Sequence, residues 1–402
     1  MNFLGFNLRL TCMLFLLVCT SNSRMIHDVD QKGVIAKIII IVDQSGKGNF
    51  TSVQKAIDSI PPNNNLWTHI YIKTAIYNEK VVIPKDKPFI ILQGESARRT
   101  IIQWQEAGSS TESSTFILHA DNFIAKDLLI RNTYNLVLPR SSNGNRILWA
   151  PAATLYSDKA SFYRCGFVGV QDTLTDLQGR HYFNNCYIEG AIDFIWGAGQ
   201  SVYGKCVINA TTGILQGPAG HITAQGRRNE NDSSGYIFLG ATIYATGPFY
   251  LGRAYTQFSR VIFKRTYIPQ AIVPEGWQPW NSAGHENTII FSEVSCSGPG
   301  SNTHERVKWE KNLALNELNK LIINRDDFFY KVSKSIIIGV IFSLPYTITI
   351  HFKSNCSDGL THRNMCGVSK RHPGPFSNQH IRKISRIARE IDLESSRICM
   401  RV

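Results

Sequence analysis

An internal repeat limits what this chain of 402 residues can fold into more than any other feature of its sequence. An aromatic residue recurs with a small residue three positions later and an apolar residue two positions after that. The frame reads Phe162-x-x-Cys165-x-Phe167, Phe183-x-x-Cys186-x-Ile188, Tyr203-x-x-Cys206-x-Ile208, Phe238-x-x-Ala241-x-Ile243, Phe263-x-x-Thr266-x-Ile268 and Phe291-x-x-Val294-x-Cys296, with an earlier copy at Phe123 and Leu128. Successive frames are 21, 20, 35, 25 and 28 residues apart. A period of this length with short apolar segments is typical of a solenoid.

The frame favours one kind of solenoid. Helical periodicity and the Leu-x-x-Leu-x-Leu core of leucine-rich repeats are both absent. We therefore predict an all-β, single-stranded parallel β-helix, in which each coil stacks the same residue above its predecessor. Short strands are predicted at residues 38–42, 69–73, 89–92 and 115–119, and residues 52–60 have the spacing of a helix that caps the open end of the core. An antiparallel sandwich also has many short strands and stays open as an alternative, although the constant frame argues against it.

The chain divides into three parts. Residues 1–23 have the charged start, short apolar run and small-x-small end of a signal peptide. Residues 24–313 form the predicted β-helix domain, and residues 314–402 form a basic tail with an apolar segment at 335–352. The tail carries 14 basic and 7 acidic residues, or +7 of the net charge of +13. Export predicts a secreted, extracellular protein and makes Asn49, Asn209 and Asn231 candidate glycan acceptors.

Two aspartates stand at the same place in consecutive repeats. Asp172 lies seven residues after Cys165, and Asp193 lies seven residues after Cys186 within a nearly apolar run. In stacked coils these carboxyl groups would be roughly 4.8 Å apart, and two acids that close do not both ionise cheaply. One protonated and one ionised carboxyl group would supply a general acid beside a base or nucleophile.

Further residues complete this candidate site. Arg253, within Leu251-Gly252-Arg253, could hold one carboxylate by two hydrogen bonds and keep it ionised. Trp277 and Trp280 lie in a Pro- and Gly-containing loop, where an indole either stacks on a sugar or covers a core edge. The stacked cysteines Cys165, Cys186 and Cys206 would lie near the Cα separation that a disulfide accepts, roughly 4.4–6.8 Å, so their pairing is left open.

Together these motifs resemble the plant pectinesterases, also called pectin methylesterases. The resemblance rests on Gln171-Asp172-Thr173-Leu174, Asp193-Phe194-Ile195-Trp196-Gly197, Leu251-Gly252-Arg253 and Ile76-Tyr77-x-Glu79, and runs from about residue 38 to residue 313. It implies a right-handed parallel β-helix that removes methyl esters from the galacturonate units of cell-wall pectin without metal or cofactor. It also implies pectin as the substrate, a proteinaceous pectinesterase inhibitor as a partner, and a monomer.

The resemblance also implies roles for residues. Asp193 would be the nucleophile, Asp172 the general acid and base, and Gln171 a hydrogen-bond donor to the oxyanion. The substrate-binding residues would be Arg253, Tyr255 and Thr115, with Tyr255 standing where the family usually has Trp.

One departure from the family pattern bears on the rate. A second oxyanion glutamine is usual in the coil before Cys165, and Trp149 stands at its place. A catalytically weakened pectin-binding homologue therefore stays open as an alternative. So does another β-helix enzyme acting on polysaccharides, a glycosidase or lyase, because close carboxylates also suit a retaining glycosidase. A nucleic-acid partner is not expected, because export and the concentration of charge in the tail argue against it.

Overall fold

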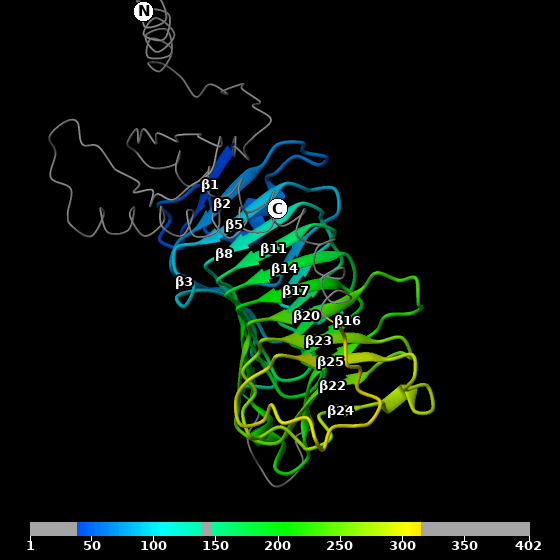
Figure 1. Cartoon of the computed structure of the whole chain (residues 1–402). Helices are drawn as coiled ribbons and strands as arrows, with labels where there is room; N and C mark the ends of the chain where they lie inside the picture. The colour runs from blue at the N-terminus through cyan, green and yellow to red at the C-terminus, as the bar shows by residue number, and fades with distance from the viewer. Residues whose placement is uncertain (1–37, 138–146, 315–402) are drawn as a thin grey trace, which may run out of the picture. The chain divides into compact units, whose positions relative to one another are not determined.

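The computed structural model describes residues 38–137 and 147–314. The predicted signal peptide and the apolar segment at 335–352 lie outside these residues, as does nearly all of the predicted tail. Within the described part, parallel strands form three sheets that run along a stack of coils (Figure 1). Each coil contributes in turn to sheets A, B and C, so that neighbouring strands in a sheet come from successive coils. This arrangement is the predicted parallel β-helix.

The strands of the three sheets are as follows. Sheet A contains β1 (Ile38–Val42), β2 (Thr68–Ile72), β5 (Ile90–Gly94), β8 (Phe123–Lys126), β11 (Ala160–Tyr163), β14 (Arg180–Asn184), β17 (Gln200–Gly204), β20 (Gly235–Leu239), β23 (Arg260–Lys264) and β25 (Ile290–Val294). Sheet B contains β3 (Ala75–Asn78), β6 (Thr100–Trp104), β9 (Leu129–Asn132), β12 (Gly166–Val168), β15 (Tyr187–Gly190), β18 (Val207–Ala210) and β21 (Thr242–Ala245). Sheet C contains β4 (Val81–Ile83), β7 (Phe116–Leu118), β10 (Ala153–Leu155), β13 (Leu174–Asp176), β16 (Ile195–Gly197), β19 (Gly220–Gln225), β22 (Phe249–Ala254) and β24 (Trp277–Gln278). Two short 3₁₀ helices, η1 (Thr212–Leu215) and η2 (Trp280–Ser282), lie in the connections.

The corner between sheets A and B explains the repeat frame. The aromatic residue of the frame points into the core near the end of a strand of sheet A, and two positions later the chain turns through one residue of positive φ. Arg164, Asn185 and Lys205 hold these corner positions, with φ of 52°, 53° and 53°. The cysteine that follows each corner residue is again buried. The three-residue step therefore spans one left-handed corner residue, and the next strand of sheet B begins two residues after this corner.

Stacking of the aromatic residues confirms the predicted register in the middle of the chain. Phe162 pairs with Phe183, Phe183 with Tyr203, Tyr203 with Phe238, and Phe238 with Phe263. Their rings stack nearly parallel, with centroids 5.0, 4.7, 4.6 and 4.3 Å apart. Such stacks add packing energy beyond the burial of apolar area.

The two outer copies of the frame were placed wrongly. Phe123 pairs with Ala160, two positions from Phe162, and Phe291 pairs with Val261, two positions from Phe263. A shift of two residues keeps a side chain on the same face of a strand, so both rings still enter the core. The inward pattern was therefore right, and the register was not.

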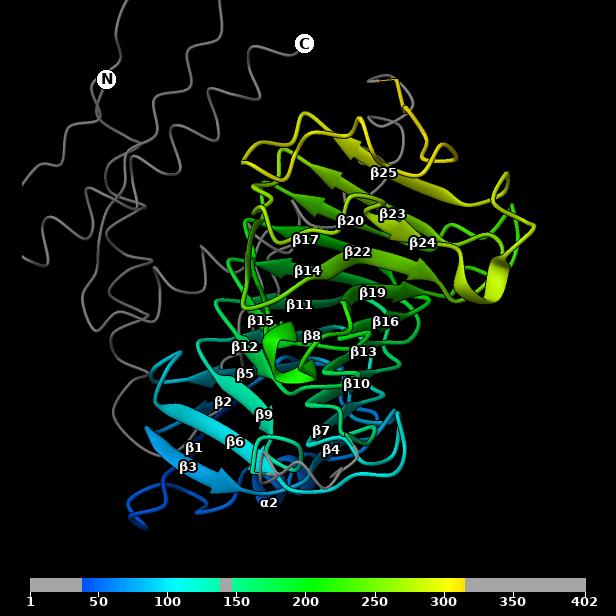
Figure 2. The ribbon, with the colours of Figure 1, turned by 90° about the horizontal axis from the view of Figure 1, so that it is seen from below.

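A short helix closes the N-terminal end of the coil stack. The prediction of a helix at residues 52–60 is confirmed by α2 (Val53–Asp58), whose Val53, Ala56 and Ile57 are buried (Figure 2). Glu79 fixes its start, because its carboxylate accepts hydrogen bonds from the N–H groups of Val53 and Gln54 at 3.0 and 2.9 Å. A carboxylate is favourable at this position, since the first N–H groups of a helix have no partner within it.

At the other end, the described chain folds back over the outer face of sheet A. Lys311 donates its backbone N–H to Phe291 at 2.8 Å, and Leu313 packs against Ile237 and Ile262. None of the helices in residues 38–137 and 147–314 is both long and apolar enough to cross a membrane. The cysteines of the frame, whose pairing the sequence left open, are free thiols.

Candidate active site

The two aspartates lie at the corner where the chain passes from sheet B to sheet C. Asp172 follows β12 and Asp193 follows β15, and the residues just before them, Gln171 and Ile192, pair with each other in parallel. Both aspartates have positive φ, 58° and 46°. Aspartate tolerates this conformation better than most residues. The repeated corner therefore places two acidic side chains on successive coils, as the equal offset in the sequence predicted.

Burial gives Asp172 an unusual proton affinity. The residue is 6% exposed, and its carboxyl group makes no hydrogen bond within the described residues. Burial, and next the charge of Asp193, raise the pKa of Asp172 to about 8, against a weaker opposing effect of Arg253. Asp172 is therefore protonated at neutral pH, because desolvation and a neighbouring negative charge both disfavour its ionised form.

Asp193 is as buried as Asp172, but it forms an ion pair with the guanidinium of Arg253. Burial raises the pKa of Asp193, while hydrogen bonds and the charge of Arg253 oppose this change. Arg253 donates from Nε to Oδ1 of Asp193 at 2.8 Å and from a terminal nitrogen to Oδ2 at 2.5 Å. A bidentate pair with a guanidinium, which is always charged, holds Asp193 as a carboxylate. Of the two aspartates, Asp193 is thus the ionised one.

The strand that carries Arg253 can approach its neighbour because of the preceding glycine. Gly252 on β22 pairs with Thr223 on β19, and a Cβ at residue 252 would lie 2.0 Å from the Thr223 hydroxyl oxygen. No side chain fits in this space, so β22 reaches its position only with glycine there. The Leu-Gly-Arg motif therefore combines a packing requirement with a functional side chain.

Aromatic side chains surround the ion pair. The guanidinium carbon of Arg253 lies 3.7 Å from the centroid of the Trp280 ring, a cation–π contact that helps to fix the arginine. Tyr255 lies between Trp280 and Trp196, at centroid distances of 5.7 and 5.8 Å. Trp277 is 1% exposed and belongs to the core, whereas Trp280 is 36% exposed. The two indoles that the sequence could not tell apart thus have different roles.

The remaining predicted residues differ in how far the structure brings them into the site. Gln171 is partly exposed beside Asp172, and its side-chain amide is not engaged by the described residues. Thr115 is fully buried, and its hydroxyl donates to the backbone carbonyl of Arg131 at 3.0 Å. The structure therefore does not bring the Thr115 side chain to the open surface beside the aspartates. Trp149 lies in the coil before Asp172 and is 49% exposed, so its indole is not part of the core.

One residue beside the site carried no signal in the sequence. His221 on β19 donates its backbone N–H to Ala191, two residues before Asp193. Its ring stacks on Tyr250 at 5.0 Å, and its Nε2 lies 3.1 Å from Oε1 of Gln278. Burial and the charge of Arg253 lower the pKa of His221 to about 3, so the ring is neutral. Its place follows from strand register across a long loop, which no local motif reveals.

In residues 38–137 and 147–314, no group of three or more His, Cys, Asp or Glu side chains is arranged to hold a metal ion. The arrangement offers instead one carboxylate, one protonated carboxyl group and a free amide donor on a single surface. Such a set can form and break a covalent ester or anhydride bond by nucleophilic attack with general acid assistance.

Comparison with known proteins agrees with this chemistry. The family model Pectinesterase matches residues 39–322. The chain is 47% identical to probable pectinesterase 29 of Arabidopsis thaliana over 283 residues, which cover 70% of this chain and 84% of that protein. It is 46% identical to probable pectinesterase 55 of the same plant, covering 70% and 86%. Among solved structures, the pectin methylesterase from carrot superposes with a TM-score of 0.66 at 27% identity, covering 75% of this chain and 98% of that chain.

Proposed function

Since the chain belongs to the pectinesterase family, as the match over residues 39–322 shows, we propose that Asp193 and Asp172 together carry out its reaction. The chain is a carboxylic ester hydrolase that removes methyl esters from pectin. The observation that carries the proposal is the difference between the two carboxyl groups. Asp193 is held ionised by Arg253, while Asp172 on the adjacent coil is protonated and without a hydrogen-bond partner in the described residues.

In the first step, a carboxylate oxygen of Asp193 attacks the carbonyl carbon of a galacturonate methyl ester. Negative charge develops on the former carbonyl oxygen, and the free amide of Gln171 donates a hydrogen bond to it. Asp172 gives its proton to the departing methoxide oxygen, so that methanol leaves. The products of this step are methanol, an acyl-enzyme anhydride at Asp193 and an ionised Asp172.

In the second step, the ionised Asp172 takes a proton from water, and the resulting hydroxide equivalent attacks the anhydride carbonyl. The bond to Asp193 breaks, the de-esterified unit of the polymer leaves as a carboxylic acid that loses its proton to solvent, and both aspartates return to their starting states. The raised pKa of Asp172, about 8, suits both directions of proton transfer at neutral pH, since a catalytic acid and base works best near the ambient pH.

The decisive experiment measures methanol release from methyl-esterified pectin by the purified chain and by Asp193→Asn. Asparagine has the size of aspartate but is a poor nucleophile, so we expect turnover to fall by about a thousandfold or more. Circular dichroism and thermal unfolding would show that the variant is folded. A folded variant with near-normal turnover would exclude Asp193 as the nucleophile.

The same assay separates the rival activities. A glycosidase or lyase would create new chain ends in the polymer, which a reducing-end assay or the absorbance of unsaturated products detects. A pectin-binding homologue without activity would retain the polymer but release no methanol. Methanol release without new chain ends supports the esterase alone.

We further propose that the protein is exported to the cell wall, where pectin is its substrate and a proteinaceous inhibitor its partner, and that it acts as a monomer. Apolar character and a cleavage pattern at residues 1–23 support export. The glycan acceptors differ in access: Asn231 is exposed in a loop, whereas the side-chain nitrogen of Asn209 donates to Tyr187 and Glu189 at 2.9 and 2.8 Å. N-terminal sequencing and glycan mapping of the secreted protein test this proposal.

A further inference from the structure

Two long connections precede the aspartates at the corner between sheets B and C. Residues 105–115 join β6 to β7, and residues 133–152 join β9 to β10. In the next two coils the corner is short, since five residues join β12 to β13 and four join β15 to β16. Backbone carbonyls in long connections fall outside the pairing of the strands, and the buried ones need another hydrogen-bond donor. One side chain supplies such a donor to both long connections.

This side chain belongs to Asn132, which ends β9 and is 1% exposed. Its side-chain nitrogen lies 2.8 Å from the carbonyl oxygen of Glu106, 3.0 Å from that of Ser113 and 3.0 Å from that of Pro151. Its side-chain oxygen accepts the backbone N–H of Tyr134 at 3.1 Å. An amide has two N–H bonds, so the three carbonyls share them. The amide thus fastens the two long connections to each other.

The Pro151 end of this link lies against Asp172. Ala152 donates its N–H to the carbonyl of Thr173 at 2.8 Å, in the parallel register of β10 and β13. One residue earlier, the same register places Pro151 level with Asp172 on the preceding coil. Ala150 and Pro151 are buried and carry no charge. The burial of Asp172 on this side therefore depends on the position of the Ala150–Pro151 turn.

The connection at residues 105–115 also reaches the strand that follows Asp172. Thr175 on β13 is fully buried, and its hydroxyl donates to the carbonyl of Ser110 at 2.9 Å and lies 3.4 Å from the carbonyl oxygen of Asp172. Gly108 donates its N–H to the carbonyl of Trp149 at 2.9 Å, next to the turn. The connection is therefore in contact with the coil that precedes Asp172 and with the strand that follows it.

The next two coils close the equivalent place without an amide. The register of sheet B places Gly169 and then Gly190 level with Asn132. A Cβ at Gly169 would lie 2.8 Å from the hydroxyl oxygen of Thr173, and one at Gly190 would lie 2.2 Å from the Cβ of Phe194. Side chains of the corner itself fill the space in those two coils. Of these three positions, 132 alone has room for a side chain that enters the corner.

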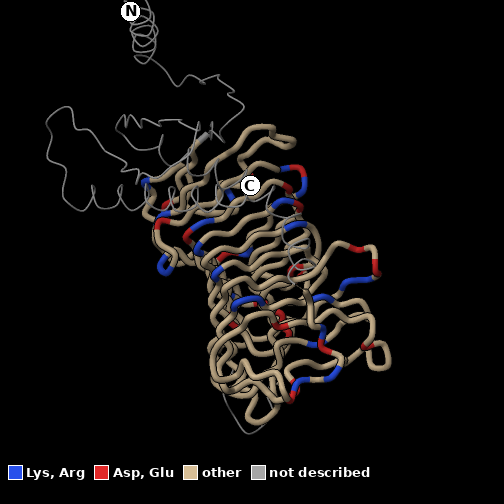
Figure 3. The backbone as a smooth tube through the Cα atoms, in the orientation of Figure 1, with Lys and Arg blue, Asp and Glu red and all other residues tan. Residues whose placement is uncertain are grey.

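Few charges act on Asp172. Burial has the largest effect on its pKa, and the charged groups that shift this pKa are Asp193 on the next coil and Arg253 on β22. In the connection at residues 105–115, Glu106 forms an ion pair at 2.9 Å with a lysine between β3 and β4, and Glu112 is exposed. Figure 3 shows the charged residues scattered over the coils and loops, with long uncharged stretches between them. The pKa of Asp172 therefore depends mainly on how far water is kept from its carboxyl group.

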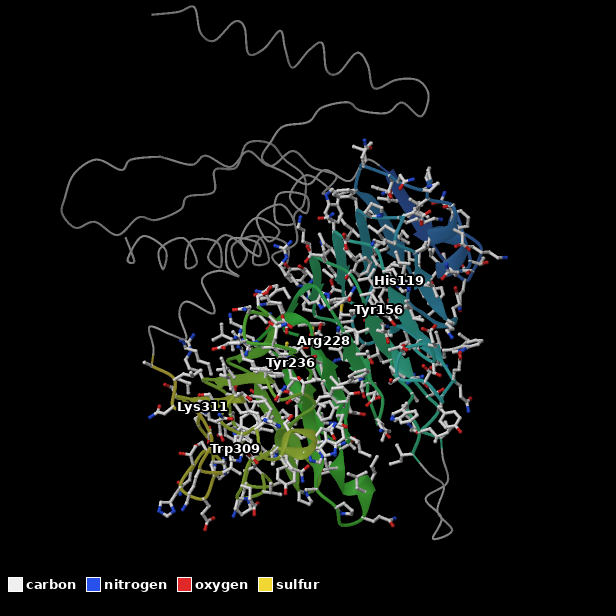
Figure 4. All side chains as sticks on the ribbon, turned by 90° about the vertical axis from the view of Figure 1, so that its right-hand side faces the viewer. His119, Tyr156, Arg228, Tyr236, Trp309 and Lys311 are labelled. Atoms are coloured by element: carbon white, nitrogen blue, oxygen red, sulfur yellow. The ribbon has the colours of Figure 1, made fainter. Side chains whose placement is uncertain are left out.

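The strands beyond the corner are held by contacts that do not involve Asn132. β7 and β10 pair in parallel, with Phe116 beside Ala153. Just after these strands, the rings of His119 and Tyr156, both labelled in Figure 4, stack with centroids 4.7 Å apart. Loss of the amide should therefore loosen the corner while the coil stack stays folded.

We propose that Asn132 is a positioning residue for the esterase reaction, because its amide holds the Ala150–Pro151 turn against the Asp172 corner and limits the hydration of the general acid. The proposal rests on the proposed function, since it assumes that Asp172 must be protonated to release methanol. Without the amide, the three carbonyls bind water instead, the turn opens, and water reaches Asp172. The ionised form of Asp172 then becomes less unfavourable.

Methanol-release kinetics of Asn132→Ala from about pH 5 to pH 9 test the proposal. The pH profile of kcat/KM reports the pKa of the essential acid in the free enzyme, so the activity of the native chain should fall above about pH 8. We expect Asn132→Ala to move this fall to lower pH by about one unit, which lowers kcat/KM at pH 8 about fivefold and changes it little at pH 6. A loss by the same factor at every pH would show that Asn132 only supports the fold, and the proposal would be wrong.

Asn64→Ala is the matched control. The side-chain nitrogen of Asn64 also donates to two carbonyls, those of Leu66 and Pro88, but this residue lies in the connection between α2 and β2. Its loss should leave the pH profile as in the native chain, and an equal shift in both variants would overturn the proposal. Asn132→Ser keeps one donor and should give a smaller shift in the same direction. If Asn132→Ala does not fold, an unshifted profile of Asn132→Ser overturns the proposal.

A stability experiment keeps this proposal separate from the esterase activity. Folded Asp172 keeps its proton up to about pH 8, against 3.8 for an ordinary aspartate, so the advantage of Asp172→Asn over the native chain should grow up to that pH. In an Asn132→Ala background, the advantage of Asp172→Asn should level off about one pH unit lower. This result would support the proposal even if no chain released methanol and the proposed function failed. Levelling off at the same pH in both backgrounds would overturn it, even if methanol release were normal.

Discussion

Replacing Asp172 by Asn should stabilise the protein while it abolishes methanol release, and the gain in stability should grow with pH. The folded chain holds Asp172 in a place where its pKa is about 8, against 3.8 for an ordinary aspartate. Between these two values the folded chain keeps a proton that the unfolded chain loses. A group with a raised folded pKa contributes stability at low pH and loses it as pH rises to the folded value. Asparagine resembles the protonated form at every pH.

The size of the effect follows from the number of protons. With one extra proton in the folded chain, the free energy of unfolding falls by about 1.4 kcal/mol for each pH unit through this window. From pH 5 to pH 7 the advantage of Asp172→Asn should therefore grow by about 2–3 kcal/mol. Under the proposed mechanism, the native chain is less stable than the variant by this amount because it keeps a buried acid for catalysis.

Denaturant unfolding of the native chain and of Asp172→Asn at several pH values measures this difference. Asp86→Asn serves as the control, since Asp86 is exposed and its side chain makes no hydrogen bond within the described residues. The control should change stability little, and equally at each pH. An advantage of Asp172→Asn that stayed constant with pH would refute the reasoning, because it would mean that Asp172 is ionised in the folded chain throughout.

The other predictions concern the support of the site. Arg253→Lys should lower turnover by about tenfold or more, because an ammonium group replaces neither the bidentate bond to Asp193 nor the stacking on Trp280; methanol-release kinetics test this, and unchanged kcat would contradict it. Gly252→Ala should lower the free energy of unfolding by about 1–3 kcal/mol, because the added Cβ would meet the Thr223 hydroxyl. Adding Thr223→Ala to this variant should restore part of the lost stability, which thermal unfolding measures. A chain that ends at residue 320 should stay soluble and rich in β structure by circular dichroism; aggregation of this chain alone would assign the tail to the fold. Trp149→Gln should raise kcat more than it changes KM, because the added amide would donate a hydrogen bond to the oxyanion in the transition state. Such a bond contributes about 2.7–4 kcal/mol. A folded variant with unchanged kcat would show that another donor already acts.

The sequence predicted the architecture because the β-helix repeats its packing in every coil. Phe162, Phe183 and Tyr203 occupy one column, so a frame read from the chain is also a frame in space. The outer copies at Phe123 and Phe291 failed because any inward position can hold an aromatic residue. The periodicity of the sequence shows whether a side chain faces the core or the solvent. Only pairing with the neighbouring coil shows which column of stacked residues the side chain joins.

The sequence likewise predicted the site residues that repeat with the coil, but not the residues that long insertions bring to the site. Asp172 and Asp193 share an offset from their cysteines, and the corner conformation that they share repeats with the coil. Arg253 was recognised through its motif, but its distance from Asp193 depends on the length of the loops between β16 and β22. His221 could not be predicted, because long insertions hide the register that brings it to the site. Trp277 lies on β24 and is buried, whereas Trp280 lies on η2 and is partly exposed, a difference that the composition of their shared loop does not reveal.

The order of the coils explains how two identical side chains at equivalent corners acquire different proton affinities. A solenoid is directional, so each aspartate has a different coil on its other side. Beyond Asp193 lie β19 and then β22, which supplies the Arg253 guanidinium through Gly252. Before Asp172 lies the coil of β10, entered through Ala150 and Pro151, neither of which carries a charge or a side-chain hydrogen-bond donor. A cation on one side and an apolar turn on the other separate the two pKa values, and under the proposed mechanism this asymmetry would set which aspartate attacks and which one donates the proton.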